Sequence, residues 1–178
     1  TTSTVDYEEW EKFRRFIDHK DLHITLADHL ARELPQDGFK EVYCRFSKTL
    51  IAVGSGAGAD RRTGLETEIV ALTNPYTDDL TSGMRVQLFY RTAVRANEQI
   101  EVFDKAPDGT VNITLTRTDA EGIATIPVTS GHSYMLDAVV LREPAAELAA
   151  SSGGVSSGVS STAAARPAIS AMRSARLP

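Results

Sequence analysis

The chain has 178 residues, of which 42% are hydrophobic and 24% are charged, and its formal net charge is −5. This size and composition are typical of one ordinary domain with an apolar core, plus additional segments. The negative net charge argues against a nucleic-acid-binding protein, and no apolar run approaches the roughly 20 residues of a membrane-spanning helix. The single cysteine, Cys44, excludes an internal disulfide.

Residues 1–38 are predicted to form a helical N-terminal segment. Asp6 is expected to accept hydrogen bonds from the first turn of its first helix. A second helix is predicted to begin at Thr25, in an approximate capping box, and to end at Pro35. The apolar residues of the first helix recur at spacings of three and four, which defines one face. They are Trp10, Phe13, Phe16 and Ile17.

Residues 39–148 are predicted to form an antiparallel, immunoglobulin-like β-sandwich of about seven strands. The first strand is expected within 40–54, which is rich in β-branched and aromatic residues, although Glu41, Arg45 and Lys48 also suit a helix in its first half. Short strand-like segments then follow at regular intervals, separated by turns that contain Gly, Pro or Asn. These segments are 67–72, 84–90, 99–104, 111–116, 123–128 and 133–141.

Alternation within 111–116 predicts a strand with one buried and one solvated face, with Ile113 and Leu115 on the buried face. The glycine-rich segment 54–64 has no apolar period and is predicted to be a flexible loop with solvated arginines. Residues 149–178 contain no aromatic residue and few large aliphatic ones, so we expect a low-complexity, disordered C-terminal tail.

The stretch TRTDAEGIATIPV (116–128) predicts a tight hairpin turn. Asp119 can accept hydrogen bonds from backbone amides across the turn, and Gly122 can adopt the left-handed conformation that other residues resist. We therefore interpret both residues as structural.

Three segments occur in an order that resembles a bacterial family of exported domains of unknown function, often described as the periplasmic component of nickel or cobalt uptake. The segments are EVYCRFSKTLIAVG, LETEIVALTNP and TDAEGIATIPVTSGHSYMLDAVVL. The resemblance covers about residues 8–148 and rests on matched motif positions. These are Tyr43, Arg45, Lys48 and Leu50, then Glu68-Ile-Val-Ala71 and Asn74-Pro75, and finally Thr118, Asp119, Gly122 and Ala124.

The resemblance implies a periplasmic location, although no signal peptide is present in this chain. Because the family's histidine-containing first strand is also absent, the chain is expected to be the C-terminal part of a longer protein. The Trp-bearing strand that closes the family's pattern is replaced by Ser, Gly and Ala after 143–150. We therefore expect an exposed sheet edge and dimerisation through it.

The candidate metal ligands are His19, His23, His29 and Asp18. His19 and His23 are four residues apart, which on a helix would place both imidazoles on one side. The resemblance points to nickel or cobalt as the ion. No framework of Cys or Glu ligands accompanies these residues, so ordinary solvated histidines are the alternative.

The remaining candidates are structural. Cys44 falls on the apolar alternation of its strand, which predicts a small buried hydrophobe. Arg45 and Lys48 are expected to form ion pairs, with Glu41, that anchor their segment to the sandwich. No nucleophile, base and orienting group can be assembled, so no catalytic residue is predicted.

The predicted function is that of a non-enzymatic periplasmic accessory module that presents nickel or cobalt to an inner-membrane uptake transporter. The alternative is a generic envelope module that binds carbohydrate or protein and has no metal role. A stoichiometric dependence on metal would distinguish the two.

Overall fold

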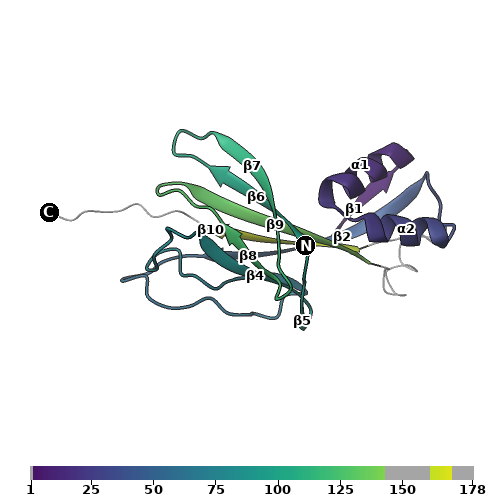
Figure 1. Ribbon diagram of the computed structural model, residues 1–178. Coiled ribbons are helices and arrows are strands. Elements are labelled where there is room, and N and C mark those ends of the chain that lie inside the picture. The colour runs from purple at the N-terminus through teal and green to yellow at the C-terminus, as the bar shows by residue number, and fades with distance from the viewer. Residues whose placement is uncertain (1, 143–160, 170–178) are drawn as a thin grey trace. The chain divides into compact units, whose positions relative to one another are not determined.

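The computed structural model describes residues 2–142 and 161–169, and these residues fall into two compact units (Figure 1). The first unit contains residues up to Arg45 and residues 139–164, and the second contains residues 46–138 and those from Ala165. The fold is mainly β with antiparallel sheets, which confirms the predicted fold class. In the described part of the chain, no helix has the length and apolar character needed to cross a membrane.

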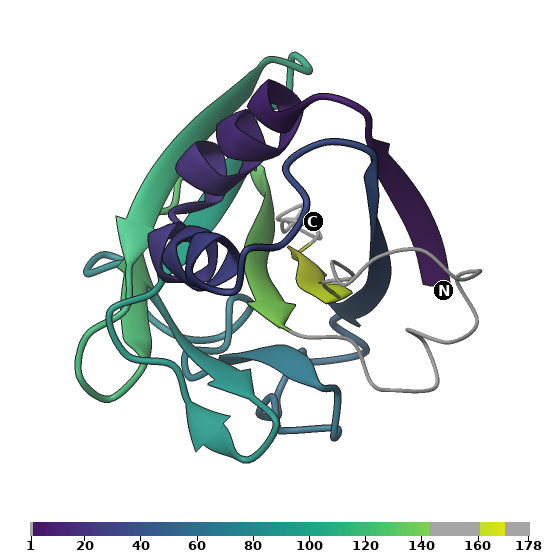
Figure 2. The same ribbon diagram turned by 90° about the vertical axis from the view of Figure 1, so that its right-hand side faces the viewer.

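The first unit combines a strand pair with two helices. Strand β1 (Thr2–Tyr7) pairs antiparallel with β2 (Phe39–Leu50), whose C-terminal end continues into the second unit. Helices α1 (Trp10–Lys20) and α2 (His23–Ala31) follow β1 and lie beside each other in both views (Figure 1, Figure 2). Strand β10 (Ser161–Ile169) is hydrogen-bonded between β2 and β9 (Ser133–Arg142).

The N-terminal segment is therefore not wholly helical, because it starts with a strand. Only Val5 and Tyr7 give β1 an apolar pattern, so it is specified by its pairing with β2 more than by its own sequence. Of the tail predicted at 149–178, the structure describes β10 alone; the rest lies outside the described residues.

Both predicted helix caps are wrong. The Trp10 amide at the start of α1 donates to Asp37 Oδ1 at 2.8 Å, so the cap comes from the later turn and not from Asp6. Helix α2 begins at His23, two residues before Thr25, without a side-chain cap. A side chain distant in sequence can satisfy a first-turn amide as well as a local one, and the local pattern does not reveal which is used.

The first unit has its own aromatic core. Its rings pack at centroid distances near 5 Å, as for Phe13 and Phe39, whose centroids lie 5.1 Å apart in an edge-to-face arrangement. The buried hydrophobic members are Tyr7, Phe13, Ile17, Leu22, Phe39, Val139 and Leu141.

The second unit is a two-layer antiparallel sandwich. In one layer β4 (Met84–Tyr90) pairs with β3 (Thr67–Ala71) on one side and with β5 (Ala93–Val94) and β8 (Ile123–Ile126) on the other. In the other layer β6 (Gln99–Lys105) lies between β9 and β7 (Val111–Arg117). Side chains from both layers form one core. They include Ile69, Val86, Leu88, Ile126, Ile100, Val102 and Leu136, each at most 4% exposed.

Strand β7 departs from its predicted burial. Ile113 and Leu115, expected to face the core, are 52% and 56% exposed. The register pairs Ile113 with Phe103 and Thr114 with the buried core residue Val102. The polar residues of β7 thus share the side of the core residue Val102, and its apolar residues lie on the other side; Asn112 and Thr114 are exposed too, so neither side of the strand is buried.

Candidate functional site

The candidate metal ligands do not assemble into a site. His19 is exposed, and His23 is 60% exposed, with its ring nitrogens 3.7 Å from Asp18 Oδ1 and 3.3 Å from Asp21 Oδ1. Throughout residues 2–142 and 161–169, no three His, Cys, Asp or Glu side chains are placed so that they could hold a metal ion.

His29 belongs to the aromatic core of the first unit. Its residue is 6% exposed, and its Nε2 lies 2.8 Å from the Pro35 carbonyl oxygen. The ring centroid lies 5.1 to 5.4 Å from the rings of Trp10, Phe13 and Phe39. His29 therefore has a packing role in this core, whereas His23 is exposed.

The motif residues of β2 have structural partners. The Arg45 guanidinium lies over the Tyr43 ring, 4.9 Å from its centroid. Lys48 Nζ lies 3.0 Å from both Asp60 Oδ2 and Glu68 Oε1, so its ion-pair partners are these carboxylates and not Glu41. Cys44 is partly buried on the same strand, where full burial was predicted.

Glu68 fastens the glycine-rich segment to the sandwich. Its fully buried carboxylate accepts hydrogen bonds from the Thr63 amide at 2.7 Å, the Thr63 hydroxyl at 2.9 Å and the Gly64 amide at 3.2 Å. Burial opposes ionisation of Glu68, but the hydrogen bonds from Thr63 and Lys48 outweigh it and lower the pKa of this carboxyl. Segment 54–64 is thus held at defined points and is not the free loop that its glycines predict.

Arg62 and Asp60 add two further attachments. The Arg62 guanidinium lies 4.5 Å from the centroid of the Phe89 ring, so this arginine packs on the sandwich and is not simply solvated. Asp60 Oδ2 accepts a hydrogen bond from the Ala71 amide at 2.8 Å. Because Ala71 ends β3, this bond occupies a backbone group at the outer edge of that sheet.

The hairpin turn has the geometry that its sequence predicts. Asp119 Oδ1 accepts hydrogen bonds from the amides of Glu121 at 3.0 Å and Ile123 at 2.8 Å. Gly122 has φ 73°, and a Cβ there would lie 3.1 Å from the Leu88 carbonyl oxygen. Both residues therefore shape the turn.

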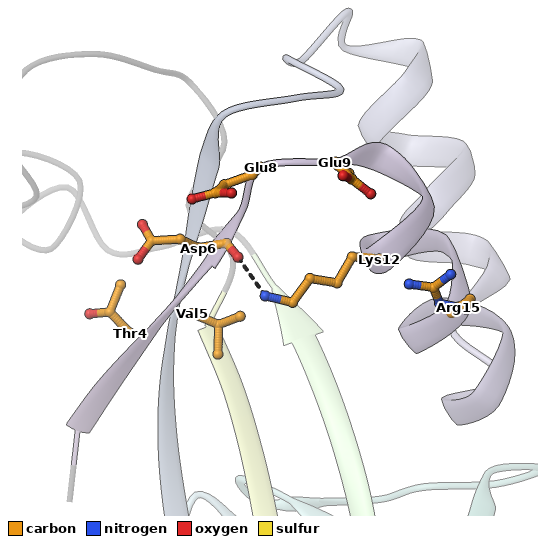
Figure 3. A pocket seen from close by; sticks show the side chains of 7 residues that line it. All are labelled: Thr4, Val5, Asp6, Glu8, Glu9, Lys12 and Arg15. Carbon is orange, nitrogen blue, oxygen red and sulfur yellow. Dashed lines mark hydrogen bonds between the residues drawn. The ribbon is translucent and has the colours of Figure 1, made fainter.

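A cavity of about 590 Å³ lies beside β1 and α1 (Figure 3). Lys12 extends from α1 toward β1, where its Nζ donates to the Asp6 carbonyl oxygen at 2.8 Å, while the carboxylates of Asp6 and Glu8 project away from α1. The lining residues are Thr4, Val5, Asp6, Glu8, Glu9, Lys12 and Arg15. Their charges have both signs and their charged side chains are exposed, so the cavity lacks the desolvated polar group of a catalytic site.

The remaining surface of interest is the outer side of β7. We call Val111, Ile113 and Leu115, together with their backbone groups, the β7 surface. These three side chains are 51%, 52% and 56% exposed and lie on one side of the strand. Ile113 is in register with Phe103, and Phe103 with Met135, so half-buried apolar side chains continue from the β7 surface across β6 and β9.

The backbone of the β7 surface also faces outward. At the two ends of the β6–β7 pair, the Ala106 amide donates to the Thr110 carbonyl at 2.9 Å, and the Thr118 amide donates to the Glu98 carbonyl at 3.0 Å. Even-numbered residues of β7 therefore bond to β6, and the N–H and C=O groups of the odd-numbered residues point away from it. Among the described strands, only β6 pairs with β7, which is the last strand of its sheet.

Sequence reasoning predicted a strand at 111–116 but missed this surface. The alternation in 111–116 predicts a buried apolar side. Alternation alone, however, does not distinguish a buried apolar side from an exposed one. The available signal was the absence of Lys, Pro, Gly and acidic residues from 111–116, since natural edge strands usually carry such protection.

Comparison with known proteins identifies the family. The sequence matches the family described as a domain of unknown function, DUF4198, over residues 1–142. The chain belongs to this family. The match includes β1 and both helices as well as the sandwich, and so extends further toward the N-terminus than the motifs that suggested a resemblance. No curated protein and no solved structure matches the chain.

Proposed function

We propose that this DUF4198 chain is a non-enzymatic interaction module that binds an extended strand of a protein along β7. The observation that carries the proposal is the apolar, half-exposed β7 surface, whose backbone groups lack a neighbouring strand among the described residues. Contiguous exposed apolar side chains mark interaction sites, and an open strand edge is a template for another strand. The resemblance to exported domains supports a place for this module in the periplasm.

The contrast with the other sheet edges supports a binding role. At β3 the Asp60 carboxylate occupies the Ala71 amide, and at β1 the Lys12 ammonium occupies the Asp6 carbonyl. Proteins cover or charge their sheet edges because open edges aggregate. An edge that is left open and apolar, while a backbone group is occupied at the edges formed by β1 and β3, is consistent with a surface kept for a partner.

The ligand chemistry follows from the strand geometry. An added strand would bond to the outward N–H and C=O groups of Val111, Ile113 and Leu115, and its alternate side chains would pack on theirs. The ligand expected is an extended segment with apolar residues at every second position. Carbohydrate is disfavoured as the ligand because the β7 surface presents aliphatic side chains and no exposed aromatic row.

A labelled peptide of sequence TVNITLTR, corresponding to residues 110–117, tests the proposal by fluorescence anisotropy. It has the required alternation and no acidic residue. We expect saturable binding to the wild-type chain, loss of binding to Ile113→Lys and unchanged binding to Ile24→Lys. Ile24 is 89% exposed on α2, so the control makes the same substitution on another surface. Equal binding of a scrambled peptide, or binding that Ile113→Lys leaves intact, would contradict the proposal.

A second candidate function is the presentation of nickel or cobalt to an inner-membrane uptake transporter. It is supported by the resemblance and by the grouping of His23 with the carboxylates of Asp18 and Asp21. Calorimetric titration with nickel, of wild-type chain and of His23→Ala, tests this function. A one-to-one signal that the variant lacks supports metal presentation, and the same weak signal from both proteins counts against it.

A further inference from the structure

We propose that the strand accepted by the β7 surface is β7 of a second copy, so that two chains form a two-fold symmetric dimer with one continuous sheet. This inference rests on the proposed function, because it uses the same edge and identifies its occupant. A two-fold axis makes the same patch serve as donor and acceptor on both copies. The patch must therefore be complementary to itself, and the sequence of β7 meets that condition.

The apolar pattern selects one antiparallel register. With the two-fold axis at Ile113, Ile113 faces Ile113 of the other copy, and Val111 faces Leu115 at both ends. All three are outward-bonding residues, so these are hydrogen-bonded pairs, and they supply roughly six intermolecular backbone hydrogen bonds. On the opposite side of the sheet, Asn112 faces Thr114, which keeps polar groups paired with polar groups.

The two registers shifted toward Arg117 are worse. With the axis at Thr114, Arg117 lies opposite Val111 of the other copy; with the axis at Leu115, Arg117 lies opposite Ile113. Either shift replaces an apolar pair with a pair of aliphatic and charged side chains. Register in a sheet is set by this kind of match, so the axis at Ile113 is favoured over both.

Charge at the ends of the strands favours the same register. With the axis at Ile113, Arg117 lies opposite Gly109 of the other copy, next to Asp108 in its turn. The Asp108 carboxylate is held at that turn by a hydrogen bond from the Thr110 amide at 2.9 Å. The guanidinium of Arg117 is oriented at the end of the strand by its bond to the Asn97 carbonyl oxygen at 2.7 Å. Opposite charges thus approach each other at both ends of the strand pair.

The symmetric arrangement also limits assembly to two chains. Each copy uses its β7 edge once, and the pairing consumes both edges, so the contact is closed and cannot propagate into a fibre. A contact made by one strand per copy is small, which places the dimer among reversible associations.

Sedimentation velocity over a series of protein concentrations tests the dimer. We expect the wild-type chain and Ile24→Lys to show the same concentration-dependent rise in mass toward that of two chains. Ile113→Lys sets two like charges opposite each other on the axis and should raise the dissociation constant at least roughly tenfold. Its circular dichroism should match that of the wild type, because Ile113 is half exposed.

Cysteine cross-linking tests the register. In a Cys44→Ser background, we expect mild oxidation to cross-link Ile113→Cys into dimers and to leave Leu115→Cys largely monomeric, because only residue 113 meets its own copy across the axis. The Cα separation of a hydrogen-bonded antiparallel pair, about 5.5 Å, is compatible with a disulfide. Preferential cross-linking of Leu115→Cys would overturn the register.

The two proposals fail in distinguishable ways. A wild-type chain that stays monomeric at all concentrations but binds the TVNITLTR peptide would overturn the dimer and retain β7 as a binding edge for another protein. A chain that stays monomeric and ignores the peptide would overturn both. Dimerisation that Ile113→Lys leaves unchanged would place the contact elsewhere and reject this inference.

Discussion

Glu41 should make the stability of this protein fall as the pH rises toward neutrality. Its side chain lies in the first unit, where the residue is 2% exposed and Oε2 accepts a hydrogen bond from the Tyr7 hydroxyl at 2.8 Å. Burial raises the pKa of the Glu41 carboxyl from 4.5 to about 7, while the bond from Tyr7 acts in the opposite direction. Burial and the nearby Glu41 also raise the pKa of the Tyr7 phenol, so this hydroxyl stays protonated in the relevant range.

The sign and size of the effect follow from proton linkage. The folded state binds the Glu41 proton more tightly than the unfolded state does, so this contribution to stability is fully present below the unfolded pKa. It is lost as the pH rises from 4.5 through about 7. One pKa unit corresponds to about 1.36 kcal/mol, so the whole shift corresponds to roughly 3 kcal/mol.

Urea unfolding of the wild type and of Glu41→Gln at several pH values measures this contribution. Glutamine cannot ionise, so the free energy of unfolding of the variant minus that of the wild type should rise by roughly 3 kcal/mol between about pH 4 and pH 8. The difference is the appropriate quantity because Glu68, whose pKa is lowered, contributes with the opposite sign in both proteins. Tyr7→Phe removes the bond that favours the carboxylate and should move the midpoint to higher pH. A difference that is constant over this range, or that falls, would refute the reasoning.

Three further substitutions test the structural roles by urea unfolding. Lys48→Met leaves two buried carboxylates without the ammonium 3.0 Å away and should cost about 3–5 kcal/mol; a loss below about 1 kcal/mol would mean that the pairs contribute little. Gly122→Ala places a residue with a Cβ in the left-handed backbone conformation, with that Cβ 3.1 Å from the Leu88 carbonyl oxygen, and should lower the free energy of unfolding by about 1–3 kcal/mol. A neutral result would show that the turn relaxes. Asp37→Ala removes the acceptor for the Trp10 amide and should cost about 1 kcal/mol, whereas an unchanged stability would make this cap dispensable.

The strands of the sandwich could be predicted because local pattern and final environment agree. Strand β4 spans 84–90 as expected, with Val86 and Leu88 buried and Arg85 exposed. The Gly122 turn could also be predicted, because few residues tolerate its backbone conformation. In both cases the information lies within a few consecutive residues.

The missed features depend on residues distant in sequence. Strand β1 needs β2 as its partner, and α1 takes its cap from Asp37, 27 residues away from Trp10. The glycine-rich segment looked free because Glu68, which holds it, lies on the following strand. A single sequence shows that these side chains can form hydrogen bonds but does not show to which groups.

The candidate site illustrates the limit of periodicity itself. An alternating strand tells which residues share a side, but the identity of the buried side is set by the neighbouring strands. In β7 the positions on the same side as the core residue Val102 hold Asn112 and Thr114, which are exposed, and the aliphatic residues on the other side are exposed as well. Leaving three aliphatic residues exposed is a loss in an isolated chain, because apolar burial is a main source of stability. A second β7 that pairs with this edge would bury part of the three aliphatic side chains and so reduce that loss. The exposed aliphatic side of β7 is therefore better explained by a bound strand than by the monomer alone.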